Sequence, residues 1–123
     1  EDIICREAEA ANIKRRHFSS GEIQTRLLLA MVNEAANILK EGVAVSAADI
    51  DLVLVHGYGF PRWRGGLMHY ADQLGATFVM AELTKLCDED PLFWQPSQLI
   101  IDCATTGRDF ASHNDQSAKQ PNV

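Results

Sequence analysis

The sequence has few of the features that metal, membrane and nucleic-acid proteins require. Its three cysteines, Cys5, Cys87 and Cys103, lie far apart without Cys-x-x-Cys spacing, which indicates reduced thiols rather than a disulfide framework or a zinc site. No run approaches the roughly 18 apolar residues that cross a bilayer, so we expect no membrane span. Lys and Arg number 11 against 17 Asp and Glu. This balance argues against a nucleic-acid partner, because phosphate binding needs an excess of basic residues.

What is present is typical of one globular domain. The 123 residues are 46% hydrophobic and 23% charged, and a chain of this length can bury a core of its own. The sequence starts at Glu1 rather than Met and shows no signal-peptide pattern, so we expect a processed chain or an excised piece.

Helical periodicity and capping signals predict an all-α fold, a compact bundle of about five or six helices. We expect a lead-in helix and linker at 1–18, anchored through Ile13 and Phe18, a helical domain at 19–111 and a disordered tail at 112–123. Residues 50–55 are rich in β-branched side chains, which also fit a strand. The Ser46 cap that precedes them favours a helix. The expected helices cover 2–11, 22–41, 49–56 and 67–74, with two more after Thr77 and Ser97.

The longest predicted helix begins with capping-box spacing, Ser19 and Glu22, and stops at Gly42. Its apolar residues fill an arc so wide that we expect partners on more than one side. One carboxylate, Glu34, falls within this arc, whereas Asn33 falls on the polar side. A carboxylate in such a place needs a hydrogen-bonding or cationic partner. The arc consists of Ile23, Leu27, Leu28, Met31, Val32, Ala35, Ile38 and Leu39.

The most unusual segment is a loop with four glycines, one proline, three aromatics and two arginines in ten residues. Gly57 and Gly59 begin a dinucleotide fingerprint, but Arg62 stands where its third glycine would lie, and no strand–helix–strand unit is predicted around it. We therefore expect turn glycines and no NAD bound by this chain. Arg62 and Arg64 can clamp a phosphate, or one of them can pair with Glu34 inside the core.

The remaining titratable residues do not form a recognisable catalytic or metal-binding pattern. His69 lies three residues before Asp72 on a predicted helix, which favours an ordinary surface contact. A general base also needs a nucleophile and a pocket, and no Gly-x-Ser-x-Gly or His-x-x-x-His spacing occurs. We predict no catalytic, cofactor-binding or metal-binding residue in this chain.

Several rare residues nevertheless occur in a fixed order across the block 22–74. In that order they resemble the C-terminal domain of 3-hydroxyacyl-CoA dehydrogenases. The stretch "FPRWRGGLMHYAD" is similar to the second, terminal copy of this domain in multifunctional β-oxidation proteins, which join an enoyl-CoA hydratase/isomerase region to the dehydrogenase. The residues that carry the resemblance are Arg26, Asn33-Glu34-Ala35, Glu41-Gly42, Asp49-Ile50-Asp51, Gly57-x-Gly59-Phe60-Pro61, Gly65-Gly66 and Asp72 with Leu74-Gly75.

The resemblance implies a fold like the 6-phosphogluconate dehydrogenase C-terminal domain. It places this chain at the carboxyl end of an NAD-dependent enzyme that oxidises (S)-3-hydroxyacyl-CoA to 3-oxoacyl-CoA. The family's catalytic His–Glu pair belongs to a Rossmann domain and its substrate-positioning asparagine to the first helical copy. The expected partners are therefore that Rossmann domain, the first copy and, through the parent enzyme, acyl-CoA.

Within this supporting role, Arg62 and Arg64 are the candidates for substrate contact. We also predict that Glu34 is buried against the glycine loop and accepts hydrogen bonds from its backbone or from an arginine, so that Glu34→Gln lowers stability. The motif residues expected to be structural are Arg26, Asn33, Glu34, Gly57, Gly59, Pro61, Gly65, Gly66 and Asp72.

The sequence also leads to expectations about an alternative function and about the cellular compartment. The alternative function is an autonomous helical interaction or dimerisation module, because broad apolar faces seek partners. The isolated domain is then a candidate homodimer. The end Pro121-Asn122-Val123 is not a Ser-Lys-Leu peroxisomal address, so we expect a bacterial cytoplasm, with an upstream mitochondrial signal as the alternative.

Overall fold

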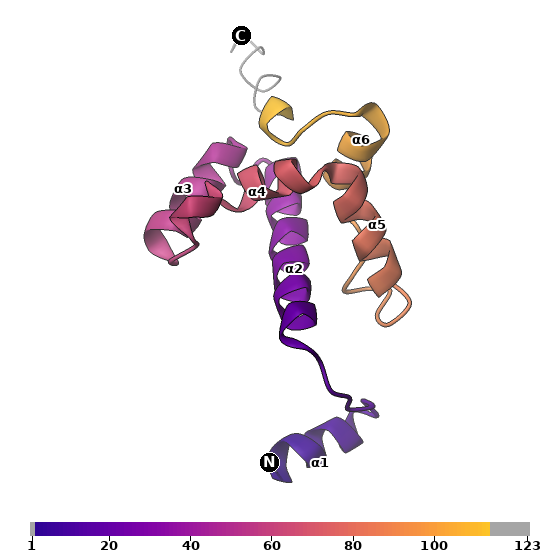
Figure 1. The fold of residues 1–123 in the computed structure, drawn as a ribbon. Helices are drawn as coiled ribbons and strands as arrows, with labels where there is room; N and C mark the ends of the chain where they lie inside the picture. Colours follow the sequence, from indigo (N-terminus) through magenta and orange to yellow (C-terminus); the bar gives the residue numbers. More distant parts are fainter. Residues whose placement is uncertain (1, 114–123) are drawn as a thin grey trace.

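The computed structural model describes residues 2–113, and every regular element in this range is helical (Figure 1). The prediction of an all-α helical domain is confirmed. The likeness to 6-phosphogluconate dehydrogenase stays an expectation. In chain order the elements are α1 (Asp2–Ala10), α2 (Ser20–Lys40), α3 (Ala47–Gly57), the 3-10 helix η1 (Arg62–Arg64), α4 (Leu67–Leu74), α5 (Ala76–Leu86), α6 (Gln98–Thr106) and the 3-10 helix η2 (Ala111–His113).

Helix α2 forms the axis of the domain and has a defined stop at each end. The Ser19 side chain accepts the N–H of Glu22 over 3.2 Å, and the Glu22 carboxylate accepts the N–H of Ser19 over 3.1 Å, so the predicted capping box is confirmed. At the other end Gly42 has φ +73° and donates to Leu39, while Val43 donates to the carbonyl of the preceding turn. These bonds satisfy the last carbonyls of the helix.

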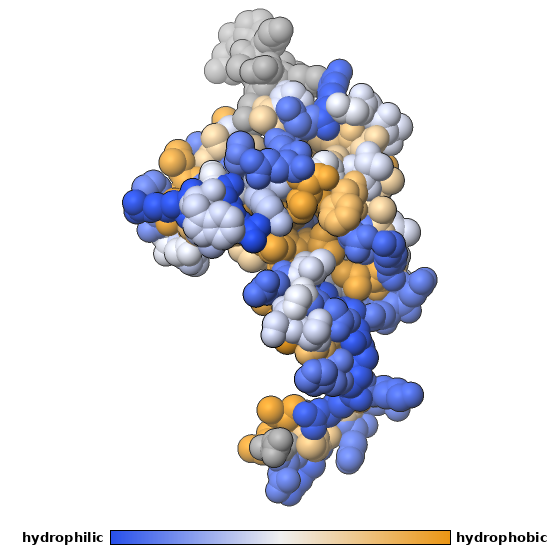
Figure 2. Space-filling view, viewed as in Figure 1, coloured by the Kyte–Doolittle hydropathy of each residue, from blue (hydrophilic) through white to orange (hydrophobic). Residues whose placement is uncertain are grey.

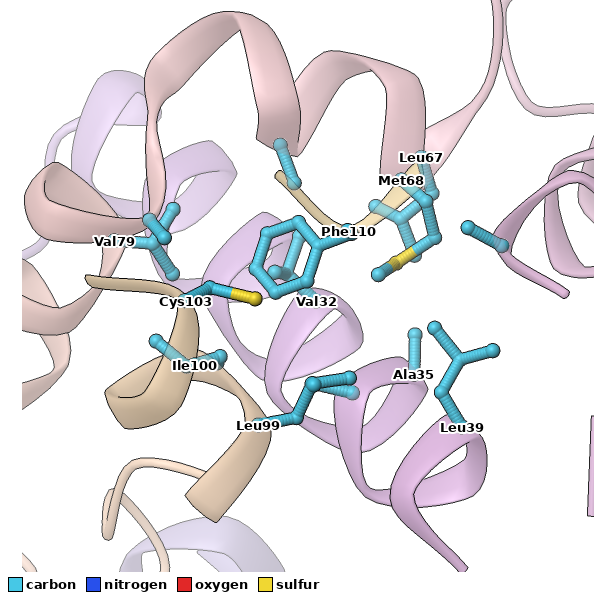
Figure 3. Close-up of a cluster of buried hydrophobic side chains, with 14 of the residues drawn as sticks. Val32, Ala35, Leu39, Leu67, Met68, Val79, Leu99, Ile100, Cys103 and Phe110 are labelled. Atoms are coloured by element: carbon cyan, nitrogen blue, oxygen red, sulfur yellow. The ribbon is translucent and has the colours of Figure 1, made fainter. Parts of the chain in front are cut away.

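The core lies where α2 packs against α4, α5 and α6. Figure 3 shows the Phe110 ring at the centre of this cluster, among Val32, Met68 and the sulfur of Cys103. Phe110 and Met68 are completely buried, and Val32 is 2% exposed. Phe110 therefore anchors the segment after α6 in the core. Burial of large apolar side chains supplies most of the stabilisation of such a domain.

Helix α3 stands apart from this core. Its N-cap Ser46 accepts the N–H of Asp49 over 3.1 Å, which confirms the helix over the strand that its β-branched residues also fit. It packs on α4 and on η2 rather than along α2. A gap lined by side chains of both helices therefore separates α2 from α3.

The helix start predicted at Thr77 was wrong, whereas the start predicted after Ser97 is confirmed. Helix α5 begins after Gly75, and Thr77 is an exposed residue inside the helix. Ser97 does occupy the N-cap of α6, but its side chain makes no capping hydrogen bond. The backbone N–H of Ser97 instead donates to Asn33, because this junction is anchored to α2 by a side chain from that helix.

The lead-in segment extends away from the helical body, with α1 at its far end (Figure 1). The predicted anchor Ile13 was wrong, since its side chain is 63% exposed. The other anchor holds: the Phe18 ring lies under the guanidinium groups of Arg16 and Arg26, 3.7 and 5.0 Å from the ring centroid. Figure 2 shows apolar residues gathered on the surface of α1, where Ile3 is 75% exposed.

At the carboxyl end the structure departs from the expected tail. Ser112 and His113, placed in that tail, belong to η2 instead. The turn forms because Ser112 donates its N–H to the Asp109 carboxylate over 2.8 Å. Residues 114–123 lie outside the described range. Within that range, no helix combines the length and the hydropathy needed to traverse a bilayer.

Candidate functional site

The loop between α3 and α4 is built from a glycine turn and one buried aromatic side chain. Gly59 has φ +72°, a conformation that favours glycine. Phe60 then turns inward, is 9% exposed and donates its N–H to Leu54 over 3.0 Å. Pro61 precedes η1. Gly57 is the last residue of α3 and lies outside the left-handed region, so it is not one of the turn glycines.

The double glycine allows a close approach of three elements. Gly65 and Gly66 have φ +79° and +125°. A Cβ on Gly65 would lie 2.5 Å from Cδ2 of His69, and one on Gly66 would overlap the Asp51 side chain. Asp51 accepts the N–H of Met68 over 2.6 Å and that of His69 over 3.1 Å. It therefore caps α4 from α3, a role that sequence reasoning missed although Asp51 belongs to the quoted motif.

The two candidate arginines have different surroundings. The Arg64 guanidinium lies 4.5 Å from the Trp63 ring centroid and 4.3 Å from that of Tyr70, a stacked arrangement that fixes its position. Arg62 is exposed, and its side chain has no hydrogen bond or ion pair with the described residues. Neither arginine pairs with Glu34, so the structure does not form the predicted core ion pair.

The prediction for Glu34 was wrong, and its neighbour Asn33 takes the anchoring role. Glu34 is exposed, because its helix position faces the open side of α2. Asn33 is 8% exposed: its Nδ2 donates to the Gln95 carbonyl over 2.9 Å, and its Oδ1 accepts the Ser97 N–H over 2.7 Å. This amide fixes the segment before α6 on α2, since a buried amide is stable only when its donors and acceptors are paired.

An apolar groove of about 760 Å³ runs between α2 and α3. Among residues 2–113, its acidic lining residues are Glu34 and Asp49, and no basic residue of this range lines it. Several of its apolar side chains are exposed, with Met31 at 38% and Val53 at 57%. Exposed apolar surface of this extent is typical of sites that contact another protein segment or a ligand. Its apolar lining is Ala30, Met31, Ala35, Ile38, Val43, Ala44, Val45, Ile50, Val53, Leu54 and Leu67.

Two other motif residues hold distant segments together. Arg26 donates to both oxygens of the Glu89 carboxylate, over 2.9 and 2.7 Å, which ties α2 to the connection after α5. Asp72 accepts the N–H groups of Phe110 and Ala111 over 2.7 and 3.2 Å. Burial raises the pKa of Asp72, although these two donors oppose the shift.

The described residues offer anchoring contacts rather than acid–base chemistry. His69 lies 3.3 Å from the Gln73 amide nitrogen and makes no hydrogen bond with Asp72, whose oxygens are used elsewhere. Burial raises the pKa of the Cys103 thiol, so this cysteine is not an activated nucleophile. Across 2–113, no three His, Cys, Asp or Glu side chains cluster as metal ligands.

The order of the motif residues is matched by a known family. The family model of the 3-hydroxyacyl-CoA dehydrogenase C-terminal domain matches residues 21–108. The chain belongs to this family. Its predicted membership of the 3-hydroxyacyl-CoA dehydrogenases is therefore confirmed.

Curated relatives of this dehydrogenase domain are large multifunctional proteins. The chain is 41% identical over 101 residues to the peroxisomal bifunctional enzyme of Pongo abelii, which covers 80% of the chain and 14% of that protein. It is 39% identical over 106 residues to the Homo sapiens enzyme of the same name, with shares of 85% and 15%. The glyoxysomal fatty acid beta-oxidation multifunctional protein MFP-a of Cucumis sativus is 38% identical over 86 residues, with shares of 70% and 12%. The dehydrogenase domain thus spans about one seventh of these mammalian relatives.

These relatives correct one expectation. The predicted bacterial cytoplasm was wrong, because the similar curated proteins are peroxisomal or glyoxysomal enzymes of mammals and plants. The prediction rested on the carboxyl end of the sequence alone, and a missing address there says nothing about the rest of a longer protein.

Proposed function

We propose that this chain is the terminal helical domain of an NAD-dependent 3-hydroxyacyl-CoA dehydrogenase of fatty-acid β-oxidation. The parent enzyme oxidises (S)-3-hydroxyacyl-CoA to 3-oxoacyl-CoA, and NAD, held by its Rossmann domain, would supply the hydride acceptor. Family membership and the similarity to peroxisomal and glyoxysomal multifunctional proteins support this proposal. The domain contributes packing and substrate-side structure to that enzyme.

NAD does not fit the residues of this chain. Within residues 2–113 there is no strand to begin a dinucleotide-binding unit, and Arg62 stands where the fingerprint needs a third glycine. The pyrophosphate-binding turn of that fingerprint also needs an uncapped helix N-terminus, whereas Asp51 occupies the N-terminus of α4. We therefore assign cofactor binding to the Rossmann domain of the parent chain.

The observation that carries the supporting role is the apolar groove between α2 and α3. Val53 in the groove is 57% exposed, and Leu27, one helical turn before the groove residue Met31 on α2, is 60% exposed. Exposed apolar surface of this extent is typical of a site that another protein segment contacts, because covering it removes apolar area from water. We assign that cover to the first helical copy of the parent chain, with the Rossmann domain nearby and Arg62 and Arg64 on the substrate side.

The test compares two charge substitutions in the full-length parent enzyme. Val53→Asp places a carboxylate in the groove, and Leu92→Asp places one at an apolar side chain that is 89% exposed and lies outside it. We expect Val53→Asp to lower the melting temperature and the dehydrogenase kcat, and Leu92→Asp to change neither. Equal behaviour of the two variants would remove the groove from the packing role.

The alternative function, an autonomous dimerisation module, rests on the same groove. Sedimentation velocity of the 123-residue chain separates the two functions. A dimer that Val53→Asp dissociates favours the module, whereas a monomer across the micromolar range favours a domain whose partner is another part of the parent chain.

A further inference from the structure

The open side of α2 carries a seam with the spacing of packed helices. Steps of four, three, four and three residues separate its members, which are Leu27, Met31, Glu34, Ile38 and Glu41. At about 100° per residue these positions lie within an arc of about 80°. Alternating steps of three and four are typical of helices that pack side by side. The spacing therefore favours a helix as the element that covers the groove, whose wall includes three members of the seam.

Glu34 is the charged residue at the centre of this seam. Its carboxylate has no hydrogen bond or ion pair with any residue of the range 2–113. On the α3 wall of the groove, the exposed carboxylate of Asp49 is also unpaired within that range. The described residues place no Lys or Arg in the groove wall to neutralise either acid. As far as the structure describes it, an otherwise apolar groove presents two negative side chains and no positive one.

Covering the groove changes the energetic cost of these charges. A carboxylate that loses its water is strongly disfavoured unless a cationic or hydrogen-bonding group faces it. An element that covers this groove must therefore present a basic side chain to Glu34, in addition to an apolar face for Met31 and Ile38. A single polar residue within an apolar helix seam selects the partner and its register, at some cost in stability.

A second copy of this chain does not meet that requirement through the same surface. In a pair with twofold symmetry the same patch lies on both subunits. The groove of one copy would offer Glu34 of the other copy only apolar side chains and the carboxylates of Glu34 and Asp49. Like charges across a contact surface disfavour that partner. The charges of the groove hence favour a partner of different sequence over a homodimer.

We infer that the groove binds a helix of the first helical copy that carries a lysine or arginine opposite Glu34. Glu34 is a specificity residue, which admits this basic helix and excludes a second copy of the chain. The inference rests on the proposed function, in which the first helical copy covers the groove, and it adds the charge that the covering helix carries. It also gives a role to the exposed carboxylate of the Asn33-Glu34-Ala35 motif.

The test measures the melting temperature of the full-length parent enzyme. Glu34→Lys brings two like charges together, so it should lower the melting temperature by about 4 °C or more, and Glu34→Gln should lower it less. Asp88→Lys is the matched control, because it reverses an exposed carboxylate outside the groove that is unpaired within the described range, and it should cause no change. In the isolated chain neither Glu34 variant should shift the melting temperature by more than about 2 °C.

The Val53→Asp variant separates failure of this inference from failure of the proposed function. If Glu34→Lys behaves like Asp88→Lys while Val53→Asp lowers the melting temperature of the parent enzyme, the charge requirement is wrong and the packing role stands. If Val53→Asp also has no effect, the proposed function fails together with the inference.

Sedimentation velocity of the isolated chain tests the exclusion of a second copy. Glu34→Leu removes the charge that opposes a symmetric pair, so we expect it to self-associate at least tenfold more tightly than the wild-type chain. Asp88→Leu is the control for a new apolar side chain on the surface, and it should behave like the wild type. Self-association of Glu34→Leu that does not exceed that of Asp88→Leu overturns the inference, as does a wild-type dimer that Val53→Asp dissociates.

Discussion

Both sides of α2 are apolar, but one side is buried in this structure and the other is exposed. The inner side, which includes Val32 and Ala36, is closed by α4, α5 and α6 and is almost fully buried. The outer side carries Ile23, Leu27 and Met31, which are 47%, 60% and 38% exposed. The comparison shows that a wide apolar arc can form two surfaces. One surface packs in the core of this domain, and the other is available to a second domain.

Neighbouring polar residues of α2 show the same division. Asn33 faces the inner side and is held by two hydrogen bonds, whereas Glu34 lies one residue further, faces the outer side and is exposed. Because one helical step rotates a side chain by about 100°, adjacent positions can serve different surfaces. The motif residues Asn33 and Glu34 therefore do not share one role.

The largest expected loss of stability follows from truncating Phe110, at the centre of the inner core. Phe110→Ala leaves a large cavity and should lower the free energy of unfolding by about 3–5 kcal/mol, measured by urea denaturation. The matched change on the outer side is Leu27→Ala, which should cost about 0.5 kcal/mol or less. Similar losses for both variants would mean that the outer side also supports the isolated fold.

The next largest difference in stability is expected between substitutions of the neighbouring residues Asn33 and Glu34. Asn33→Ala removes the buried amide and leaves its two partners, the Gln95 carbonyl and the Ser97 N–H, unpaired, so it should lower the free energy of unfolding by about 2–3 kcal/mol. Glu34→Gln should change it by about 0.5 kcal/mol or less, contrary to the expectation from the sequence. Denaturation of both variants in the same buffer tests this difference, and a larger loss for Glu34→Gln would contradict it.

Substitutions of glycines between α3 and α4 test whether the backbone there is as constrained as the core. Gly66→Ala forces a side chain onto φ +125° and into Asp51, and should cost about 1–3 kcal/mol in thermal unfolding. Gly57→Ala is the control, since no atom lies within 4 Å of its hypothetical Cβ and its helical position should gain up to about 1 kcal/mol. Equal tolerance at both positions would show that this loop is not fixed.

The smallest expected effect concerns the contact that holds the lead-in linker. Hydrogen bonds from Ser19 and Arg16 lower the pKa of Glu22, and those from Arg26 lower the pKa of Glu89. A lowered carboxyl pKa stabilises the folded contact above the ordinary value of 4.5, and this contribution is lost as the pH falls through the lowered pKa. NMR shifts of the linker amides should therefore change on acidification below about pH 4.5. In Arg26→Gln the Glu89 part of this change should occur at a higher pH.

The helices were predictable because their signals are local. The capping box at Ser19 and Glu22 and the stop at Gly42 lie within a few residues of the ends they define. The α4 boundaries, Leu67–Leu74, follow from the glycines on either side in the same way. Local hydrogen bonds decide where a helix begins and ends, so one sequence contains enough information.

The site was harder to predict because its contacts cross long sequence separations. Asp51 caps a helix whose first N–H groups are 17 residues away, and Asn33 binds Gln95 across 62 residues. Periodicity places a residue on an arc but does not say which part of the arc finds a partner. Glu34 was therefore assigned to the core, although the buried polar residue is Asn33, which periodicity had placed on the polar side.

The position of Phe110 has a consequence for how the domain is made. The ring that fills the centre of the core comes from near the carboxyl end of the domain, and Asp72 of α4 holds the backbone there. During synthesis the earlier helices leave the ribosome with an unfilled core and acquire its last part only when residue 110 emerges. A premature stop codon a few residues before Phe110 thus yields nearly all of the helices and none of the closed domain.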